Sequence, residues 1–498
     1  MESIYRCENE NAVEQSTGYE MVIGVEVHVQ LATESKAFSP SRCCYGEEPN
    51  SATDPVVMGL PGALPVINYG AIRQTARAGL MLHCKIAKAC SWDRKNYFYP
   101  DSPKNYQITQ QEQPLCVGGY VEIELPGPSR NIMGIHRNVK LNRIHLEEDV
   151  GKLTHYSNYS LIDFNRAGTP LMEIVSEPDL YSADEVAAFL NAIRMSMESA
   201  GISHCNMEKG EMRCDVNVSI RPSGSKKLGM RAELKNLNSI SGIQEAIKYE
   251  VSRQVQILQS GGTLYQETRR WNAQLSISES MRRKENAQDY CYFPEPDLMP
   301  VYLSKDIVDQ WEKELPERTY DCQRRFMKQY GLPYTITSVL CFHLPLAIFF
   351  EKAVQFCGNA RAIANLIVND LLREISQIGR STSDFPVSAE SLAHLVRLVD
   401  DGAISKQASQ DVLAEICKNG GDVTEVIKRL GHGQNQNSDA LESICRQAIG
   451  TSEKAVAEFL SGKENAINAI KGKVMKISQG KADPKRIDCM LRSLLQQS

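Results

Sequence analysis

The sequence predicts an α+β protein: a mixed N-terminal domain with a central antiparallel sheet, then an all-α domain, then a small α-helical tail. In the first 300 residues, apolar and polar residues alternate with a period of two in short segments that Gly, Pro and Asn interrupt, a pattern typical of half-buried strands. Beyond residue 300, apolar residues recur at helical spacing. We place a flexible N-terminus at 1–17 and the three domains at 18–300, 301–404 and 405–498.

Composition is that of an ordinary globular chain. Of its 498 residues, 42% are apolar and 23% are charged, and the net charge is -5, so any nucleic-acid surface must be local. The 15 cysteines follow no regular framework, and the polar N-terminus does not resemble a secretory signal. Both features predict a reducing, cytoplasmic location. The longest apolar run, 339–350, is too short to cross a bilayer, so we expect no membrane association.

Individual elements of the first domain are well marked. Strands are expected within "MVIGVEVHVQLA", "GGYVEIELPG" and "RCDVNVSIRP". A helix is expected within "YSADEVAAFLNAIRMSMESAG", where Ser182 is the N-cap, Glu185 completes a capping box and Gly201 ends the helix.

The strand "GVEVHVQ" (24–30) predicts the first candidate site residues. Side chains alternate along a strand, so Glu26 and His28 share one face and the neighbouring valines share the other. A Glu and a His in this arrangement can both reach a divalent cation. A strand with a polar, solvated outer face would produce the same pattern, and the segment alone leaves both interpretations open.

Two further strands and one acidic stretch carry similar polar rows. "MRCDVNVSI" places Asp215 on a polar face, and "AELKNLN" does the same for Glu233. "IHLEEDVGK" contains three consecutive acids, which predict either a solvated turn or a cation site. If these rows face one cleft, they form a set suited to Mg²⁺ and its waters, although no spacing rule requires them to converge. The set is Glu26, His28, Glu147, Glu148, Asp215 and Glu233.

Two basic regions allow more than one interpretation. Residues 93–110 interleave Arg and Lys with Tyr and Phe, which predicts a nucleic-acid or phosphate surface or, equally, a packed loop. Residues 463–492 hold eight basic and three acidic side chains, which predicts either a phosphate-backbone footprint or a lysine-rich solvated helix. The chain has no P-loop motif, no G-x-S-x-G motif and no cysteine spacing typical of zinc.

Long stretches of the chain resemble the B subunits of tRNA-dependent amidotransferases, which act on glutamyl-tRNA(Gln) and aspartyl-tRNA(Asn). The resemblance is carried by "IGVEVHVQL", "SWDRKNYFYPDSPKNYQITQ", "LEEDVGK", "NRAGTPLMEIVSEPD", "MRCDVNVSIRP", "AELKNLNS", "QETRRW", "DYCYFPEPDLMP" and "GKVMKISQGKADP". It extends from about residue 18 to the C-terminus.

The resemblance implies a carbon–nitrogen ligase that takes its amide nitrogen from glutamine. A cradle-like catalytic domain would phosphorylate the side-chain carboxylate of misacylated tRNA with ATP and then amidate it. A partner of the A type, which is an amidase, would supply the ammonia, and a small partner of the C type would complete a heterotrimer. A non-catalytic tRNA-binding subunit of the same complex is the alternative. One sequence does not tell whether Glu-tRNA(Gln), Asp-tRNA(Asn) or both are substrates.

The resemblance also assigns roles to residues. It places the Mg²⁺ environment at His28 and Glu148, with Glu26, Glu147, Asp215 and Glu233 around the ion and its waters. Lys95 and Lys104 match polar residues near the ammonia inlet. The basic tail residues expected to contact tRNA are Lys473, Lys476, Lys481 and Lys485.

The chain departs from some of the proteins it resembles at an N-terminal zinc site. Where those relatives carry two cysteine pairs, this sequence has Ser39, Ser41, Asp54 and Val57, so we expect no zinc. Gln30 replaces a Glu of some relatives, which leaves a second cation site open.

Overall fold

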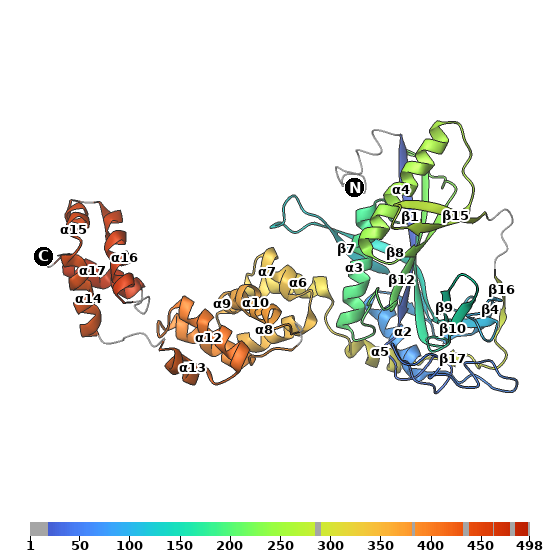
Figure 1. Cartoon of the computed structure of the whole chain (residues 1–498), viewed down its shortest axis with the longest axis horizontal. Helices are drawn as coiled ribbons and strands as arrows, with labels where there is room; N and C mark the ends of the chain where they lie inside the picture. Colours follow the sequence, from blue (N-terminus) through green and yellow to red (C-terminus); the bar gives the residue numbers. More distant parts are fainter. Residues whose placement is uncertain are drawn as a thin grey trace. The chain divides into compact units, whose positions relative to one another are not determined.

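The computed structural model describes residues 18–283, 290–380, 384–431, 438–461, 463–478 and 484–496. It divides into two compact units, Met1–Arg318 and Thr319–Ser498. The first unit combines a large mixed sheet with helices, and the described part of the second unit is helical (Figure 1). The predicted α+β class is therefore confirmed, whereas the predicted domain boundaries stay predictions.

A ten-stranded sheet organises the first unit. Its neighbouring strands run antiparallel except β13 and β14, which are parallel. In sheet order the strands are β15 (Ile277–Arg283), β14 (Glu267–Asn272), β13 (Ala232–Leu237), β12 (Met212–Pro222), β1 (Tyr19–Gln30), β11 (Pro170–Ser176), β8 (Ile135–Glu148), β6 (Cys116–Val117) and β2 (Lys85–Ile86), with β7 (Tyr120–Leu125) paired to the first part of β8.

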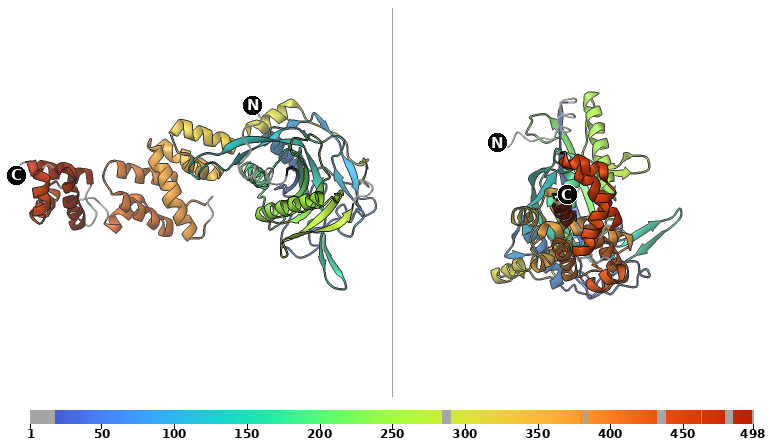
Figure 2. Two further views of the ribbon diagram at one scale, coloured as in Figure 1. Left: turned by 90° about the horizontal axis from the view of Figure 1, so that it is seen from above. Right: turned by 90° about the vertical axis from the view of Figure 1, so that its left-hand side faces the viewer.

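Three smaller sheets and four helices complete the described part of this unit. The sheets are β16 (Cys291–Pro294), β4 (Asp93–Asn96) and β5 (Tyr106–Thr109); β9 (Lys152–His155) with β10 (Ser160–Asp163); and β3 (Ala89–Cys90) with β17 (Val301–Tyr302). The helices are α2 (Tyr69–Met81), α3 (Ala183–Ser199), α4 (Ile240–Gln259) and α5 (Lys305–Lys313). Figures 1 and 2 show α3 and α4 together on one side of the large sheet.

The central strand β1 shows why the two faces of the sheet differ. Val25, Val27 and Val29 are buried in the hydrophobic core, together with apolar residues of α3 and α4. Glu26 and His28 alternate with these valines and are half-buried. Burial of the apolar face fixes the register, because a slip of one residue would exchange the two faces. The polar row of β1 therefore faces away from the core.

The start of α3 agrees with the capping pattern in the sequence. Ser182 has an extended backbone, and its hydroxyl accepts a hydrogen bond from the Glu185 N–H at 3.0 Å. The Glu185 carboxylate accepts one from the N–H of Tyr181 at 2.7 Å, one residue earlier than a standard capping box. Gly201 follows the helix with a φ of 63°, which a glycine adopts without steric cost.

The second unit contains two hydrophobic cores. The first includes buried residues from Cys322 to Val426, and the second extends from Leu441 to Leu495. The helices are α6 (Thr319–Tyr330), α7 (Tyr334–Leu340), α8 (Leu344–Phe356), α9 (Ala360–Asn365), the π-helix η1 (Leu366–Leu371), α10 (Leu372–Gln377), α11 (Ala389–Asp400), α12 (Lys406–Asn419), α13 (Val423–Leu430), α14 (Ser438–Gly450), α15 (Glu453–Leu460), the 3₁₀ helix η2 (Glu464–Ala466), α16 (Ile467–Ile477) and α17 (Pro484–Gln496). The predicted boundary at 404 falls inside the first of these cores, because Val412 and Leu413 of α12 belong to it.

The apolar run at 339–350 forms the end of α7, a turn and the start of α8. Within the described residues, no single helix is long and apolar enough to cross a bilayer. Taken together, α7 and α8 pass that test by length and composition, but they are bent by 113° at the turn between them.

Of the four positions compared above with a zinc site, Asp54 carries a carboxylate that the other three contact. The hydroxyls of Ser39 and Ser41 both donate to Asp54 Oδ2, Ser41 at 2.9 Å. The N–H of Val57 donates to Asp54 Oδ1 at 2.8 Å. Although burial opposes it, these hydrogen bonds lower the pKa of Asp54. The carboxylate thus cross-links this loop.

We expect Asp54→Asn to destabilise the first unit by about 1–2 kcal/mol at pH 7, because hydrogen bonds to a charged acceptor are lost. Asp54 titrates lower in the folded than in the unfolded chain, so its contribution is present above the unfolded pKa near 3.8 and disappears as pH falls through the folded pKa. Urea unfolding followed by tryptophan fluorescence measures it, since Trp92, Trp271 and Trp311 all lie in the first unit. Equal stability of the two proteins at pH 7 would contradict this role.

Candidate active site

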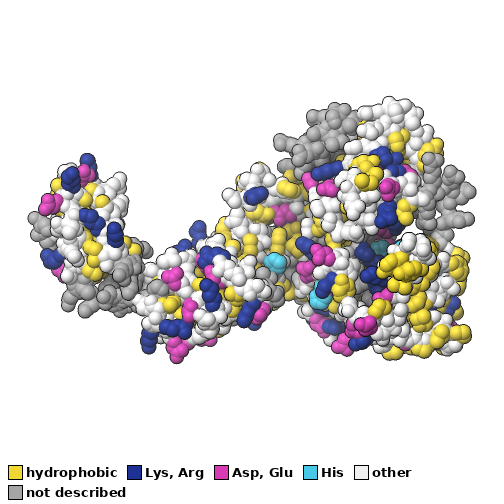
Figure 3. Space-filling model, in the orientation of Figure 1, with side chains coloured by type: hydrophobic (Ala, Val, Ile, Leu, Met, Phe, Trp, Pro, Cys, Tyr) yellow, Lys and Arg dark blue, Asp and Glu magenta, His cyan; other side chains and the backbone are white. Residues whose placement is uncertain are grey.

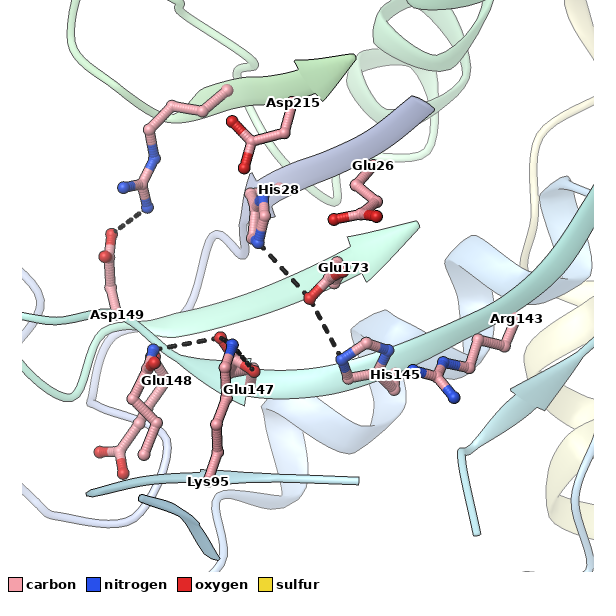
Figure 4. Close-up of polar contacts among 12 residues, drawn as sticks. Glu26, His28, Lys95, Arg143, His145, Glu147, Glu148, Asp149, Glu173 and Asp215 are labelled. Atoms are coloured by element: carbon pink, nitrogen blue, oxygen red, sulfur yellow. Dashed lines mark hydrogen bonds and ion pairs between the residues drawn. The ribbon is translucent and has the colours of Figure 1, made fainter. Parts of the chain in front are cut away.

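Four strands bring polar residues side by side on the face of the sheet away from the core. In the register, His28 of β1 lies opposite Arg213 of β12 and opposite Glu173 of β11, and Glu173 lies opposite His145 of β8. Glu173 Oε2 is 3.4 Å from His28 Nε2 and 3.3 Å from His145 Nε2 (Figure 4). One carboxylate oxygen therefore lies within ion-pair distance of two imidazoles.

The charges in this row shift one another's pKa. Burial disfavours the charged carboxylate of Glu173, but His145 and His28 hold its pKa well below the ordinary value. Burial also lowers the pKa of His28, yet the charge and hydrogen bond of Glu173 outweigh this effect and raise it. The row consequently retains a negative carboxylate beside a partly exposed imidazole.

A second row, next to the first, is strongly acidic. Glu26 lies opposite Asp215, and Glu233 lies opposite Asn217 on the neighbouring strand. Burial raises the pKa of Glu26, and the charges of Glu173, Asp215 and Glu233 raise it further. Carboxylates crowded in this way repel one another, so a positive charge beside them would stabilise the arrangement.

Lys235 of β13 supplies part of the opposing charge. Its Nζ forms ion pairs with Asp215 and with Glu233, the latter at 3.0 Å. Burial works against the charge of Lys235, but Asp215 and Glu233 raise its pKa. Thr268 donates to the second oxygen of Glu233 at 2.8 Å, and Asn217 donates to Glu26 at 3.1 Å. Glu26 has no Lys or Arg ion-pair partner among the described contacts. The positive charge of Lys235 therefore lies on the side of Asp215 and Glu233.

Glu147 and Glu148 point to opposite sides of the end of β8. Lys95 Nζ lies 3.4 Å from both carboxylate oxygens of Glu147. Glu148 instead forms an ion pair with Lys104 and accepts a hydrogen bond from the N–H of Ile108 at 2.9 Å. Figure 4 shows the carboxylate of Glu148 directed away from His28. Side chains alternate along a strand, so adjacent residues cannot both face the His28 row.

Asp149 directly follows β8 and interacts with two arginines. Arg213 donates to Asp149 Oδ2 at 2.6 Å, and Arg166 lies 3.6 Å from the same oxygen. Burial raises the pKa of Asp149, but Arg213 and Arg166 bring the net shift downward. Arg213 and Arg166 also line a cavity of about 1180 Å³, and so does Gln30, two residues beyond His28 on β1. The polar row and this cavity are therefore neighbours that share Arg213.

One group of side chains fits a divalent cation. The ligand atoms of His28, Glu147 and Glu173 all lie within 4.8 Å of one another, and all three residues come from neighbouring strands. Two carboxylates and one imidazole suit a hard cation that keeps several waters, and the carboxylates of Glu26 and Asp215 on the same face are of the kind that orients such waters. The donor set therefore fits Mg²⁺.

The structure brings together most of the residues predicted from the sequence. Glu26, His28, Glu147, Asp215 and Glu233 share the polar face. Glu148 does not lie with them, because adjacent residues of β8 point to opposite faces of the strand. Their role in metal binding stays a prediction.

The loop at 93–110 is largely packed. Arg94 is held by Glu295, and its guanidinium lies 4.3 Å from the centroid of the Tyr106 ring, which leaves it little freedom to bind phosphate. Phe98 and Tyr99 are exposed.

Sequence reasoning missed Glu173 and His145. Glu173 is a single acid in the otherwise apolar and buried strand "PLMEIVS", a placement that is costly without a partner. His145 lies two residues before Glu147 on the same strand face. The alternation argument, extended to β8, would have found His145, and the isolated charge in an apolar strand was the available signal for Glu173.

Of the four tail lysines predicted to contact tRNA, two can be described in full. Lys473 and Lys476 are exposed, and Lys473 Nζ donates to the carbonyl of Thr451 at 2.5 Å. Lys481 lies outside the described residues, and the side chain of Lys485 is likewise not described.

Comparison with known proteins gives consistent matches along the chain. Residues 21–309 match the family described as the GatB/GatE catalytic domain, and residues 348–495 match the GatB domain. The chain is similar to proteins named as B subunits of aspartyl/glutamyl-tRNA(Asn/Gln) amidotransferase. It is 52% identical over 480 residues to that of Opitutus terrae, 41% over 482 residues to that of Carboxydothermus hydrogenoformans, and 42% over 478 residues to that of Thermoanaerobacter pseudethanolicus. Each alignment covers 96% of this chain and 99% of the relative.

If His28, Glu147 and Glu173 hold the cation, Glu173→Gln should lower the affinity for Mn²⁺ at least tenfold, because a charged ligand becomes a neutral one. Glu148→Gln should change the affinity less than threefold, because its carboxylate contacts Lys104 instead. Electron paramagnetic resonance of free Mn²⁺ during titration measures both values. A larger loss with Glu148→Gln than with Glu173→Gln would assign the cation to the opposite face of β8.

Proposed function

Because the chain belongs to the family of aspartyl/glutamyl-tRNA(Asn/Gln) amidotransferase B subunits, we propose that it activates and amidates the side-chain carboxylate of an amino acid carried by misacylated tRNA. The substrates are Glu-tRNA(Gln), Asp-tRNA(Asn) or both. The observation that supports this proposal most directly is the group of His28, Glu147 and Glu173 beside a large cavity.

The reaction requires two substitutions. A carboxylate oxygen of the substrate attacks the γ-phosphorus of ATP, and ADP leaves with the electrons of the broken P–O bond. Ammonia then attacks the acyl carbon, phosphate leaves, and the nitrogen loses a proton. Phosphorylation is necessary because oxide is too poor a leaving group. The first step depends on positioning and charge neutralisation, and no protein nucleophile takes part.

The polar face supplies the charges that this chemistry needs. His28, Glu147 and Glu173 would hold Mg²⁺, which when bound neutralises the phosphate oxygens of ATP. Glu26, Asp215 and Glu233 would orient its waters, and Lys235 limits the repulsion among them. Arg213, fixed by Asp149 at the mouth of the cavity, is placed to attract the substrate carboxylate.

Lys95 of β4 and Lys104 of the loop between β4 and β5 contact Glu147 and Glu148 from the side of the small sheet formed by β4, β5 and β16. We assign to this side the inlet for ammonia, which an A-type amidase partner would release from glutamine, with a small C-type partner in the same complex. An enclosed route protects the acyl phosphate from water. The family relationship does not favour a purely tRNA-binding role. Function in the cytoplasm fits the free state of all described cysteines.

The decisive experiment uses the complex with its amidase partner and misacylated tRNA. Glu173→Gln should reduce kcat for amidation about 100-fold, both with glutamine and with ammonium chloride as nitrogen source, since charge stabilisation at the phosphoryl group is lost. The exposed Glu312 of α5 provides the matched control, and Glu312→Gln should retain full activity. ADP release and amidated tRNA are quantified together. Unchanged kcat in Glu173→Gln would exclude this site as the place of activation.

The tail formed by α14–α17 would bind tRNA outside the catalytic domain. It has its own core, so a chain that ends after Gly431 should keep the remaining cores intact, whereas a chain cut after 404 would expose buried residues of η1, α10 and α11. We expect the 1–431 chain to bind tRNA at least tenfold more weakly with unchanged affinity for ATP. Full-length Lys476→Glu is the matched charge variant and should weaken binding in a salt-dependent manner. Equal tRNA affinity of the shortened and full chains would remove the tail from tRNA binding.

A further inference from the structure

The β9–β10 hairpin presents an unusual aromatic surface. Its strands, Lys152–His155 and Ser160–Asp163, pair only with each other among the described strands. Near the turn, Tyr156 and Tyr159 are 51% and 59% exposed, and Leu161 is 55% exposed. An isolated two-stranded ribbon is marginally stable, and clustered apolar side chains in solvent are typical of binding surfaces. The hairpin therefore has the features of a binding arm.

The two tyrosines form one ordered platform. Their ring centroids are 4.8 Å apart with an interplanar angle of 19°, so the rings are stacked. The N–H of Tyr156 donates to the carbonyl of Tyr159 at 2.9 Å, and His155 Nδ1 lies 2.8 Å from Ser160 Oγ. These contacts close the turn and hold the rings together. The result is a flat aromatic surface on which another planar group can stack.

The base of the hairpin belongs to the cavity beside the polar row. Lys152 and Asp163, which face each other at the open end of the hairpin, line this cavity together with Arg166 and Arg213. A strand rises about 3.4 Å per residue, so the aromatic tip stands roughly 10–14 Å from the cavity. Figure 3 shows Lys and Arg side chains in the hollow next to the apolar surface over β9 and β10.

Charge alone does not select an occupant for this region. The cavity lining includes Lys and Arg residues, but it also includes Glu34, Glu47, Asp163, Glu208 and Glu211. A surface of mixed sign attracts phosphates weakly. Stacking on aromatic rings, by contrast, stabilises single-stranded bases without regard to sequence, and each base contributes a substantial share of affinity.

The covalent structure of the substrate determines which part of the tRNA lies next to the hairpin. In the proposed function, the reacting carboxylate belongs to an amino acid esterified to the 3′-terminal ribose of tRNA. When that carboxylate reaches the His28–Glu173 row, the terminal nucleotide must occupy the cavity, and the unpaired nucleotides before it must leave through its mouth. We propose that Tyr156 and Tyr159 form a stacking platform for these unpaired 3′-terminal bases. This inference rests on the proposed function.

The test uses the complete complex and compares three changes made at both tyrosines. Tyr→Ala removes the rings, Tyr→Leu keeps apolar volume without a flat ring, and Tyr→Phe keeps the ring without the hydroxyl. KM and kcat are measured with charged tRNA at saturating ATP. In parallel, fluorescence is recorded for tRNA that carries 2-aminopurine next to the terminal adenosine, because stacking quenches this base.

We expect the Ala and Leu variants to raise KM for charged tRNA 10- to 100-fold, with kcat and the KM for ATP within twofold of the wild type. The quenching should disappear in both variants. Phe variants should match the wild type in all respects. Tyr302→Ala on β17, which removes another exposed tyrosine, should have no effect and serves as the matched control.

The outcomes separate this proposal from the proposed function. Absence of turnover in the wild-type complex would contradict the proposed function. If the wild type is active, and the Ala and Leu variants show the same KM and the same quenching as the wild type, the stacking platform alone is overturned. Wild-type behaviour of the Leu variants would overturn stacking as the interaction. Loss of the amidase partner on size exclusion, with tRNA affinity unchanged, would identify the hairpin as a protein interface and also overturn the proposal.

Discussion

The polar face of the sheet depends on an antiparallel register that holds like charges close together. Burial of the valines of β1 fixes the position of Glu26 and His28, and pairing with β11 and β12 then brings Glu173 and Asp215 next to them. The carboxylates have no freedom to separate without slipping a strand, which would move apolar side chains into water. Repulsion is therefore built into the sheet, and a cation is the natural means of relieving it.

The same constraint separates the tasks of neighbouring acids. Because successive side chains of β8 alternate, Glu147 lies with His28 and Glu173, whereas Glu148 contacts Lys104 and the backbone of β5. Asp149, at the end of the strand, fixes Arg213 and Arg166 at the cavity. Three consecutive acids thus contact three different regions, namely the His28–Glu173 row, Lys104 beside the small sheet, and the arginines that line the cavity.

Much of this arrangement could be predicted from the sequence. Alternation identified the polar faces of β1, β12 and β13, and capping residues identified α3 closely. Convergence could not be predicted, because it depends on which strands become neighbours, and Glu173 was missed because its strand is buried on both sides. Glu148 was included both from the sequence pattern and from the resemblance, although the alternation rule places its side chain on the face opposite to that of Glu147. The cross-link of the loop by Asp54 could not be predicted either, because it depends on a side-chain hydrogen bond between residues that are 15 positions apart in the sequence.

The central claim is that His28, Glu147 and Glu173 hold one cation which carries the ATP phosphates. Anomalous scattering from crystals grown with Mn²⁺ and a non-hydrolysable ATP analogue tests it most directly. The account predicts a single strong peak at ligand distance from His28 Nε2 and from carboxylate oxygens of Glu147 and Glu173, with the triphosphate beside it. A peak between Glu148 and Lys104, or a triphosphate bound with no peak on this face, would contradict it.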